Sequence, residues 1–238
     1  MKKYKQLVLF VVPAILFSLS SCNFHCVDAE GDIITDNRIV ESFNGIDISI
    51  PANVKIIMGD EPGITITAPE SYVNAITTSI TRNKLIILGD VCKADNSDIV
   101  IEITTTAIEV VKVSGSANVY SDFHIKSENL ELKVNGSGSI SLSIFTNDVD
   151  GDINGSGNII LNGTCQNIDV DINGSGDFKS LGLKSFRARV KISGSGKASV
   201  VAHNKLHATV HGSGEISYSG NPEISINISG SGEVNKVN

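Results

Sequence analysis

The chain has 238 residues, of which 19% are charged and 5% aromatic, and it contains no Trp. Its formal net charge is −7, and loss of the three lysines among the first five residues would make the balance 16 − 26 = −10. An acidic chain lacks the basic surface that nucleic-acid binding requires, so no nucleic acid is expected as a partner. Val, Ile, Thr, Ser, Asn and Gly dominate the middle and the end of the chain, a composition that favours strands over helices.

The first 21 residues have the parts of a secretory signal peptide. Lys2, Lys3 and Lys5 precede an apolar run from Leu7 to Leu19, which small residues follow. The run is shorter than the roughly 20 residues that a membrane-spanning helix needs. Residues 1–21 are therefore expected to be removed on export.

The segment Leu19-Ser20-Ser21-Cys22 resembles the lipobox of bacterial lipoproteins, in which the Cys becomes the first mature residue and carries acyl groups. Acyl chains hold a protein at a membrane, because each buried CH₂ contributes about 0.8 kcal/mol. We therefore predict lipid attachment at Cys22 and an anchor in the bacterial outer membrane, on the cell surface or on the periplasmic face. Residues 22–37 are interpreted as a polar tether.

With Cys22 lipidated, an odd number of cysteines remains. Cys26 lies in the tether and Cys92 in a polar turn region; the sequence permits a disulfide between them, but their spacing does not require one. Cys165 lies within a repeat and is expected to be a small buried residue. No Cys/His pair has the spacing of a zinc site, and no metal or other cofactor is predicted.

The strongest signal is an internal repeat in residues 113–238. The triplet Gly-Ser-Gly recurs every 18 to 21 residues, after an imperfect first copy, Gly115-Ser116-Ala117. An apolar residue stands two places before the first glycine and two places after the third residue of every copy. The glycines predicted to form structural turns are Gly115, Gly136, Gly138, Gly155, Gly157, Gly174, Gly176, Gly194, Gly196, Gly212, Gly214, Gly230 and Gly232.

Apolar and polar positions around each triplet alternate with a period of two, which is typical of strands with one buried face. If the alternation continues through the triplet, both glycines point inward at a corner where the backbone nearly meets the opposite wall. Turns that recur in one column every 18 to 21 residues predict an all-β fold, a single-stranded β-helix or β-solenoid. A propeller blade would need about twice this length.

Two ligand-binding interpretations of the triplet have less support. A phosphate-binding loop precedes a helix, whereas strand-like sequence follows every triplet. A calcium-binding nonapeptide repeat needs a recurring Asp near each glycine pair, and only Asp177 meets that requirement. These glycines are therefore expected to serve the backbone.

Residues 38–112 are also rich in predicted strands but lack the triplet. Segments 54–60 and 63–68 are predicted to form a hairpin, and segments 85–88 and 99–103 further strands. Segment 72–80 is predicted to contain a helical turn, with an extended crossover as the alternative. This part either caps the first coil of the solenoid or supplies irregular coils of its own.

The chain resembles a family of bacterial adhesins, the auto-transporter adhesin head GIN domain. The resemblance rests on Phe43 with Gly45-Ile46, on Ile56 to Asp60, on Leu85 to Ile87 and on the Gly-Ser-Gly series, and it covers residues 40–234. It implies a right-handed β-helix and a role in cell adhesion. The family offers no catalytic residues that could be transferred to positions of this sequence.

Acidic residues concentrate in two adjacent repeats, at Asp148, Asp150, Asp152, Asp169, Asp171 and Asp177. The alternation places Asp150, Asp152, Asp169 and Asp171 on the outer face, as a stripe that either holds a cation or faces solvent. Arg187 and Arg189 follow one repeat later and are expected to pair with these acids, a contribution that is small at a surface.

Three histidines, His203, His207 and His211, have a spacing that would suggest a metal site on a helix. On a strand the same spacing separates neighbouring histidines by about 13 Å, so they are expected to be ordinary surface residues. Beyond the leader the tyrosines are only Tyr72, Tyr120 and Tyr218, so a sugar-stacking site is not indicated.

These features predict an exported lipoprotein that acts as an adhesin or interaction module of the cell envelope, without catalysis. Its partner would be a protein or a glycan. The alternatives are a scaffold that faces the periplasm and, third, a polysaccharide-acting β-helix enzyme, which a pocket joining acids and a base would favour. No capping segment is evident after the last repeat, so a homo-oligomer is expected to cover that end.

Overall fold

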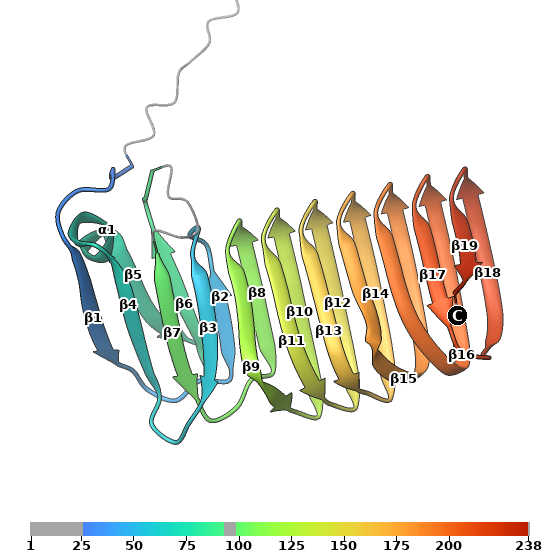
Figure 1. Ribbon diagram of the computed structural model, residues 1–238, viewed down its shortest axis with the longest axis horizontal. Coiled ribbons are helices and arrows are strands. Elements are labelled where there is room, and N and C mark those ends of the chain that lie inside the picture. Colours follow the sequence, from blue (N-terminus) through green and yellow to red (C-terminus); the bar gives the residue numbers. More distant parts are fainter. Residues whose placement is uncertain (1–25, 93–98, 238) are drawn as a thin grey trace, which may run out of the picture.

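A computed structural model describes residues 26–92 and 99–237. Here the chain forms a β-solenoid of about seven turns, as predicted, and its coils lie side by side in a row (Figure 1). Within the described residues, no helix combines the length and apolarity needed to cross a membrane. The predicted signal peptide and Cys22 fall outside the described residues.

Two parallel sheets face each other, and each coil contributes one strand to each. In spatial order, sheet A contains β6 (Lys84–Gly89), β2 (Gly45–Ile48), β8 (Val110–Gly115), β10 (Asn129–Gly136), β12 (Asp148–Gly155), β14 (Asn167–Gly174), the second half of β15 (Asp177–Gly194), the second half of β16 (Lys197–Gly212) and β18 (Glu223–Gly230). Sheet B contains β7 (Val100–Thr105), β3 (Asn53–Met58), β9 (Asn118–Lys126), β11 (Ser139–Phe145), β13 (Asn158–Thr164), the first halves of β15 and β16, β17 (Glu215–Ser219) and β19 (Glu233–Lys236). β15 and β16 bend around the lower corner in Figure 1 and so belong to both sheets.

Aliphatic side chains fill the space between the sheets in stacked columns. The column two places before the triplets is fully buried through six coils, at Val113, Val134, Ile153, Ile172, Ile192 and Val210. Burying such a side chain stabilises the fold by about 1.5–3 kcal/mol. In the last coil the equivalent Ile228 is 41% exposed, because no strand of the described residues pairs with the outer edge of β18.

The triplets form the tight turns from sheet A to sheet B, at the upper edge of the row in Figure 1. The first glycine of each copy has a positive φ, between 113° and 134°. A Cβ atom added to Gly155 would lie 2.5 Å from the carbonyl oxygen of Gly136 in the preceding coil. The first glycine therefore faces the neighbouring coil, not the opposite wall as the alternation predicted, because coils stacked about 4.8 Å apart leave no room for a side chain there.

The second glycine of the triplet is constrained by the core. A Cβ atom on Gly138 would lie 2.6 Å from Cγ1 of Val113, in the preceding coil. The inward direction predicted for this position thus agrees with the contacts of Gly138. The backbone ladder also continues through the turn, since the amide of Ser156 donates to the carbonyl of Gly136 at 2.9 Å.

The N-terminal part continues both sheets, but its coils do not follow chain order. β2 and β3 form the coil next to β8 and β9, and β6 and β7 form the coil beyond it. The predicted hairpin of segments 54–60 and 63–68 is wrong. β7 occupies the edge of β3 and extends its parallel ladder, so β4 (Gly63–Pro69) pairs with β7 and not with β3.

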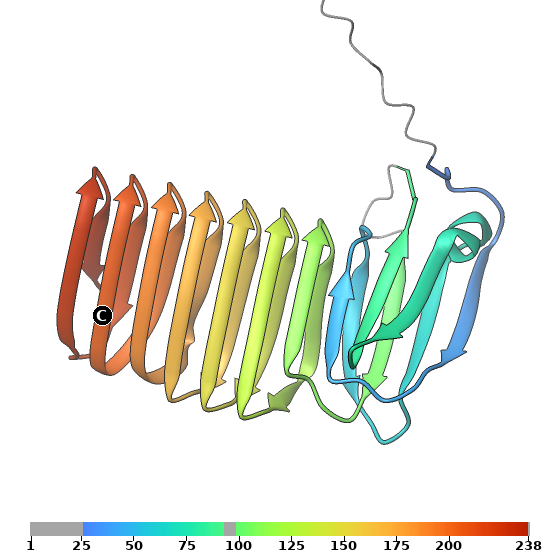
Figure 2. The ribbon, with the colours of Figure 1, turned by 180° about the vertical axis from the view of Figure 1, so that it is seen from behind.

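Antiparallel elements close this end of the solenoid (Figures 1 and 2). β1 (Ile33–Ile39) pairs with β4, and α1 (Glu70–Ala75) leads into β5 (Ile76–Thr81), which pairs with β6. One expectation is corrected, because the segment 22–37 interpreted as a tether already contains the start of β1. The helical turn predicted within segment 72–80 is present as the end of α1, and β5 follows it. The N-terminal part thus supplies both a cap and two irregular coils.

Two side-chain links hold this cap together. The guanidinium of Arg38 on β1 donates to the carbonyl oxygens of Ile76, at 2.9 Å, and of Val73, at 3.2 Å. Cys26 and Cys92 form a disulfide, with their Cα atoms 5.0 Å apart, so the pairing that the sequence left open is made. Cys165 is free and buried, as expected, and burial is the main cause that raises the pKa of its thiol to about 12.

Candidate functional site

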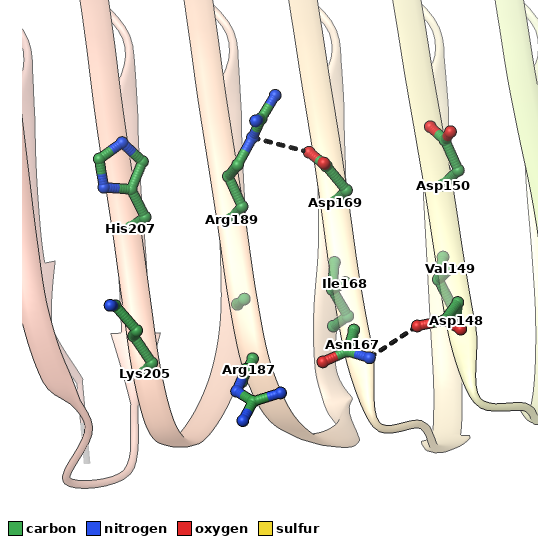
Figure 3. Close-up of a pocket in the computed structure, with 11 residues that line it drawn as sticks. Asp148, Val149, Asp150, Asn167, Ile168, Asp169, Arg187, Arg189, Lys205 and His207 are labelled. Atoms are coloured by element: carbon green, nitrogen blue, oxygen red, sulfur yellow. Dashed lines mark hydrogen bonds and ion pairs between the residues drawn. The ribbon is translucent and has the colours of Figure 1, made fainter.

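Charged side chains gather on the outer face of sheet A, across β12, β14, β15 and β16. The parallel register stacks residues that stand at equal distances before the triplet glycines. Two such rows are visible in Figure 3. The lower row consists of Asp148, Asn167, Arg187 and Lys205, and the upper row of Asp150, Asp169, Arg189 and His207.

The two rows border a groove with a volume of about 430 Å³. Its floor contains Val149, Ile168 and Ala188, which belong to the buried face of the strands. A neighbouring hollow of about 380 Å³ shares residues of β12 with the groove and adds Glu109 and Glu131. The face is therefore acidic over β12 and β14 and basic over β15 and β16, with the boundary between β14 and β15. Beyond these strands the charges are mixed, with Lys133 beside Glu131 on β10 and Glu223 on β18.

Ion pairs within the chain lie at this boundary. Arg189 Nε is 3.1 Å from Asp169 Oδ1. Lys191 Nζ is 3.6 Å from Asp171 Oδ1, an ion pair that is too long to be a hydrogen bond and leaves this oxygen without one. Because all four side chains are about a third to a half exposed, each pair contributes at most about 1 kcal/mol to stability.

One strand further from the boundary on each side, the charges have no ion-pair partner in the part of the chain that the structure describes. These groups are Asp148 and Asp150 on the acidic side and Lys205 and His207 on the basic side. The carboxylate of Asp148 accepts a hydrogen bond from a neutral group, Asn167 Nδ2, at 2.6 Å. The outer parts of the face therefore carry charge that is free to meet a partner.

The acidic side shows electrostatic repulsion. The pKa of Asp150 is raised, first because burial disfavours its charged form and then because Asp152 and Asp169 lie nearby; the ammonium of Lys133 opposes this shift. Lys133 itself pairs with Glu131 at 2.7 Å and with Asp152 at 3.2 Å, which raises the pKa of Lys133. A positive group placed beside Asp150 would relieve the repulsion.

The stripe of four acids that the alternation predicts is present. Asp150, Asp152, Asp169 and Asp171 do lie on the outer face of sheet A. Asp177 is separate from them, because it follows the triplet turn on the sheet B half of β15 and pairs with Lys179 at 3.0 Å. Among residues 26–92 and 99–237, no group of three or more His, Cys, Asp and Glu side chains is arranged to hold a metal ion.

The arginines and histidines divide between different surroundings. Arg189 pairs with an acid as expected, whereas Arg187 lies over the ring of Phe186, 5.3 Å from its centroid. His203 lies at the corner between the two halves of β16, apart from His207 and His211 on the face.

The aromatic residues also differ in their placement. Tyr72 and Tyr218 are buried, and Tyr120 is exposed. An exposed ring that the sequence analysis did not weigh, Phe145, stacks on His124 with the ring centroids 4.7 Å apart.

Sequence reasoning missed two members of the lower row. Asn167 and Lys205 each stand seven residues before the first glycine of a triplet, as do Asp148 and Arg187. Extending the repeat alignment to that position would have found all four, because the register of a solenoid carries a sequence column directly into a spatial row.

The fold and the face together define a class: a two-sheet β-solenoid built from Gly-Ser-Gly repeats, with a groove of segregated charge on one sheet. Within that class, the chain belongs to the family described as "Putative auto-transporter adhesin, head GIN domain", whose model matches residues 42–222. No curated protein matches the chain.

Solved structures share this architecture. A "putative adhesin" from Bacteroides fragilis has a TM-score of 0.79 and 22% identity, over 88% of this chain and 99% of that one. A "putative lipid binding protein" from Parabacteroides distasonis has a TM-score of 0.73 and 24% identity, over 89% and 99%. A "putative adhesin" from Parabacteroides merdae has a TM-score of 0.70 and 24% identity, over the same shares. At these identities the likeness is one of fold.

Proposed function

We propose that this protein is an exported, non-catalytic lipoprotein of the outer membrane that acts as an adhesin, and that the charged face of sheet A is its binding surface. The observation that carries the proposal is the segregation of charge along that face, with unpaired groups at both ends of the groove. Scattered surface charges keep a protein soluble, whereas ordered opposite charges match one partner and reject others.

The scaffold suits a binding role. Stacked coils hold every side chain of a row at a fixed spacing of about 4.8 Å, so the face is organised before a partner arrives. Its polar groups stand on strands and not on mobile loops, which lowers the ordering cost of binding. Family membership and the "putative adhesin" structures support the same role.

Export and anchoring rest on the sequence of residues 1–22. The lipobox-like segment would place acyl chains on Cys22, a few residues before the disulfide at Cys26. The solenoid would then stand at the membrane by its capped N-terminal end. An adhesin also requires that this anchor face outward; an inward-facing anchor would make the protein a periplasmic scaffold.

Protease or antibody accessibility on intact cells tests the proposal, with lysed cells as the control. We expect the protein to be accessible on intact cells, and we expect Cys22→Ala to release it from the membrane fraction. Protection until lysis would refute adhesion and turn the search toward envelope partners.

A cell-adhesion assay tests the role of the charged face separately from the location of the protein. Cells that display the Lys205→Glu/His207→Glu double variant should lose adhesion while surface exposure stays unchanged. A double variant on sheet B, Lys126→Glu/Lys184→Glu, changes the net charge by at least as much, since histidine counts as neutral, and we expect it to adhere normally. Equal adhesion by both variants would remove sheet A from the proposal.

One observation favours a second candidate, an enzyme that acts on a polysaccharide. The groove joins carboxylates, among them Asp150 with its raised pKa, to the guanidinium of Arg187, and shifted carboxylates mark many catalytic sites. Incubation of the purified protein with uronate-containing polysaccharides tests this candidate. Cleavage of the polysaccharide that Asp150→Asn abolishes would establish the enzyme. If the polysaccharide stays intact, binding is the role that remains.

A further inference from the structure

We propose that the partner of the charged face is a second copy of this chain, docked face to face through sheet A about a two-fold axis that runs parallel to the strands between β14 and β15. The inference deepens the proposed function and rests on its assignment of the binding surface to sheet A. It follows from the order of the charges along the two rows.

The face is self-complementary under this rotation. The axis reverses the direction of the solenoid, so β12 of one copy would lie over β16 of the other, and β14 over β15. In the upper row, Asp150 would meet His207 of the second copy. In the lower row, Asp148 would meet Lys205 of the second copy.

The groups that meet in this way are those without partners inside the chain. Near the axis, Asp169 and Arg189 already pair within the chain, at 3.1 Å. One strand out on either side, Asp148 and Asp150 form no ion pair with a cation, and Lys205 and His207 form none with an acid, among the described residues. Glu223 on β18 is the register neighbour of Lys205 but does not pair with it. Two independent sets of groups without ion pairs, one acidic and one basic, thus lie at equal distances from one axis.

The competing symmetric arrangement is rejected by the same charges. A two-fold axis along the length of the solenoid, between the two rows, would place each strand over its own copy and exchange the rows, with Asp150 against Asp148 and Lys205 against His207 of the second copy. Like charges placed together oppose association. Within one chain, burial first and then the neighbouring Asp152 and Asp169 already raise the pKa of Asp150.

The size of the face predicts a weak and reversible contact. The face takes in the six strands of sheet A from β10 to β18, three on each side of the axis. At a spacing of about 4.8 Å between strands, and with seven residues of about 3.3 Å from each, it measures about 29 by 23 Å. Two copies would bury about 1,300 Å² in total, near the lower limit of specific interfaces. We therefore expect association at protein concentrations of about 0.1–1 mM, weakened at least about tenfold in high salt because ions screen exposed charges.

This geometry agrees with contact between two envelopes. Because the axis reverses the solenoid, the capped N-terminal ends of the two copies would lie at opposite ends of the pair. Chains anchored near these ends would join two facing membranes more readily than they would pair within one. The proposed adhesion would then be between cells that carry the same protein.

Sedimentation of the purified protein tests the inference with two complementary variants. Asp148→Lys/Asp150→Lys makes the acidic strand basic, and Lys205→Glu/His207→Glu makes the outer basic strand acidic. Each variant alone should be monomeric, because like charges would meet at both ends of its interface. An equimolar mixture should form a one-to-one heterodimer, since one set of contacts then keeps its original sign and the other is restored with the sign reversed.

The control is the sheet B double variant Lys126→Glu/Lys184→Glu, which we expect to associate as the unmodified chain does. Circular dichroism shows whether each variant keeps its strands, and rescue in the mixture cannot come from unfolded protein. The inference fails if the unmodified chain stays monomeric at 1 mM in low salt, on the order of the weakest affinity expected, if either variant associates alone, or if the mixture does not. These results do not depend on exposure at the cell surface, so adhesion could fail while the dimer holds, or the reverse.

Discussion

At the scale of single residues, two separate structural constraints, or demands, require glycine in the triplets. One is a backbone conformation with positive φ, which residues with a Cβ adopt only at a cost. The other is the approach of the preceding coil, whose glycine carbonyl oxygen occupies the place of a Cβ. Gly115 meets the first demand only, with φ of 113° and no atom near its absent Cβ, because it opens the series of stacked triplets.

This difference allows the two demands to be measured separately. Gly115→Ala should lower the free energy of unfolding by about 1–2 kcal/mol, the cost of a left-handed residue. Gly155→Ala should cost more than that, because its Cβ would also lie 2.5 Å from the oxygen of Gly136 and push two coils apart. Urea unfolding of both variants measures the difference in the free energy of unfolding. Equal losses would show that the carbonyl of the preceding coil can move away from the new Cβ at no cost.

At the scale of elements, the repeat half was predictable and the N-terminal half was not. The columns around each triplet carry both the strand period and the register, so strands such as β12 and β14 and the coil order follow from the alignment alone. In the N-terminal half, neighbouring strands such as β3 and β4 look like a hairpin. Their separation depends on β7, which comes 42 residues after the end of β3 and competes for the same edge through tertiary packing.

The candidate face was predictable in part for the same reason. The outward direction of Asp150 and Asp169 follows from alternation, and the separation of Asp177 follows from the turn predicted at the triplet before it. Which of the two arginines pairs with an acid depends on side-chain packing, here the ring of Phe186 beneath Arg187. Sequence columns fix strand positions but not these choices.

The disulfide that fastens the N-terminal segment gives a prediction at this scale. It joins cysteines 66 residues apart, and closing a loop of that length in the unfolded chain stabilises the fold by up to about 4 kcal/mol. Cys26→Ser/Cys92→Ser should therefore unfold at a lower urea concentration, with a loss of about 2–4 kcal/mol. Reduction of the unmodified protein should reproduce the loss and leave the double variant unaffected; a variant as stable as the oxidised protein would contradict this role.

At the scale of the whole molecule, the two ends of the solenoid are built differently. The N-terminal end is closed by antiparallel strands, α1 and the hydrogen bonds of Arg38. At the other end all of β18 is exposed, including Ile224, Ile226 and Ile228. In a stack where each coil contacts only its neighbours, the outermost coil contributes least to the others.

Deleting the outermost coil and deleting a coil inside the stack should therefore differ sharply in their effect on stability. Removing residues 221–238 takes away only β18 and β19, and we expect a folded chain whose stability falls by about 2–4 kcal/mol, as the side chains of Leu206, Ala208 and Val210 become the new open face.

Removing residues 43–60 takes out β2 and β3, the coil that lies between β6–β7 and β8–β9. Because this internal coil pairs with neighbours on both of its sides, its removal takes away two interfaces instead of one, and we expect loss of cooperative unfolding. Circular dichroism during urea titration compares the two chains; similar curves would mean that the coils on either side of the gap fold independently of each other.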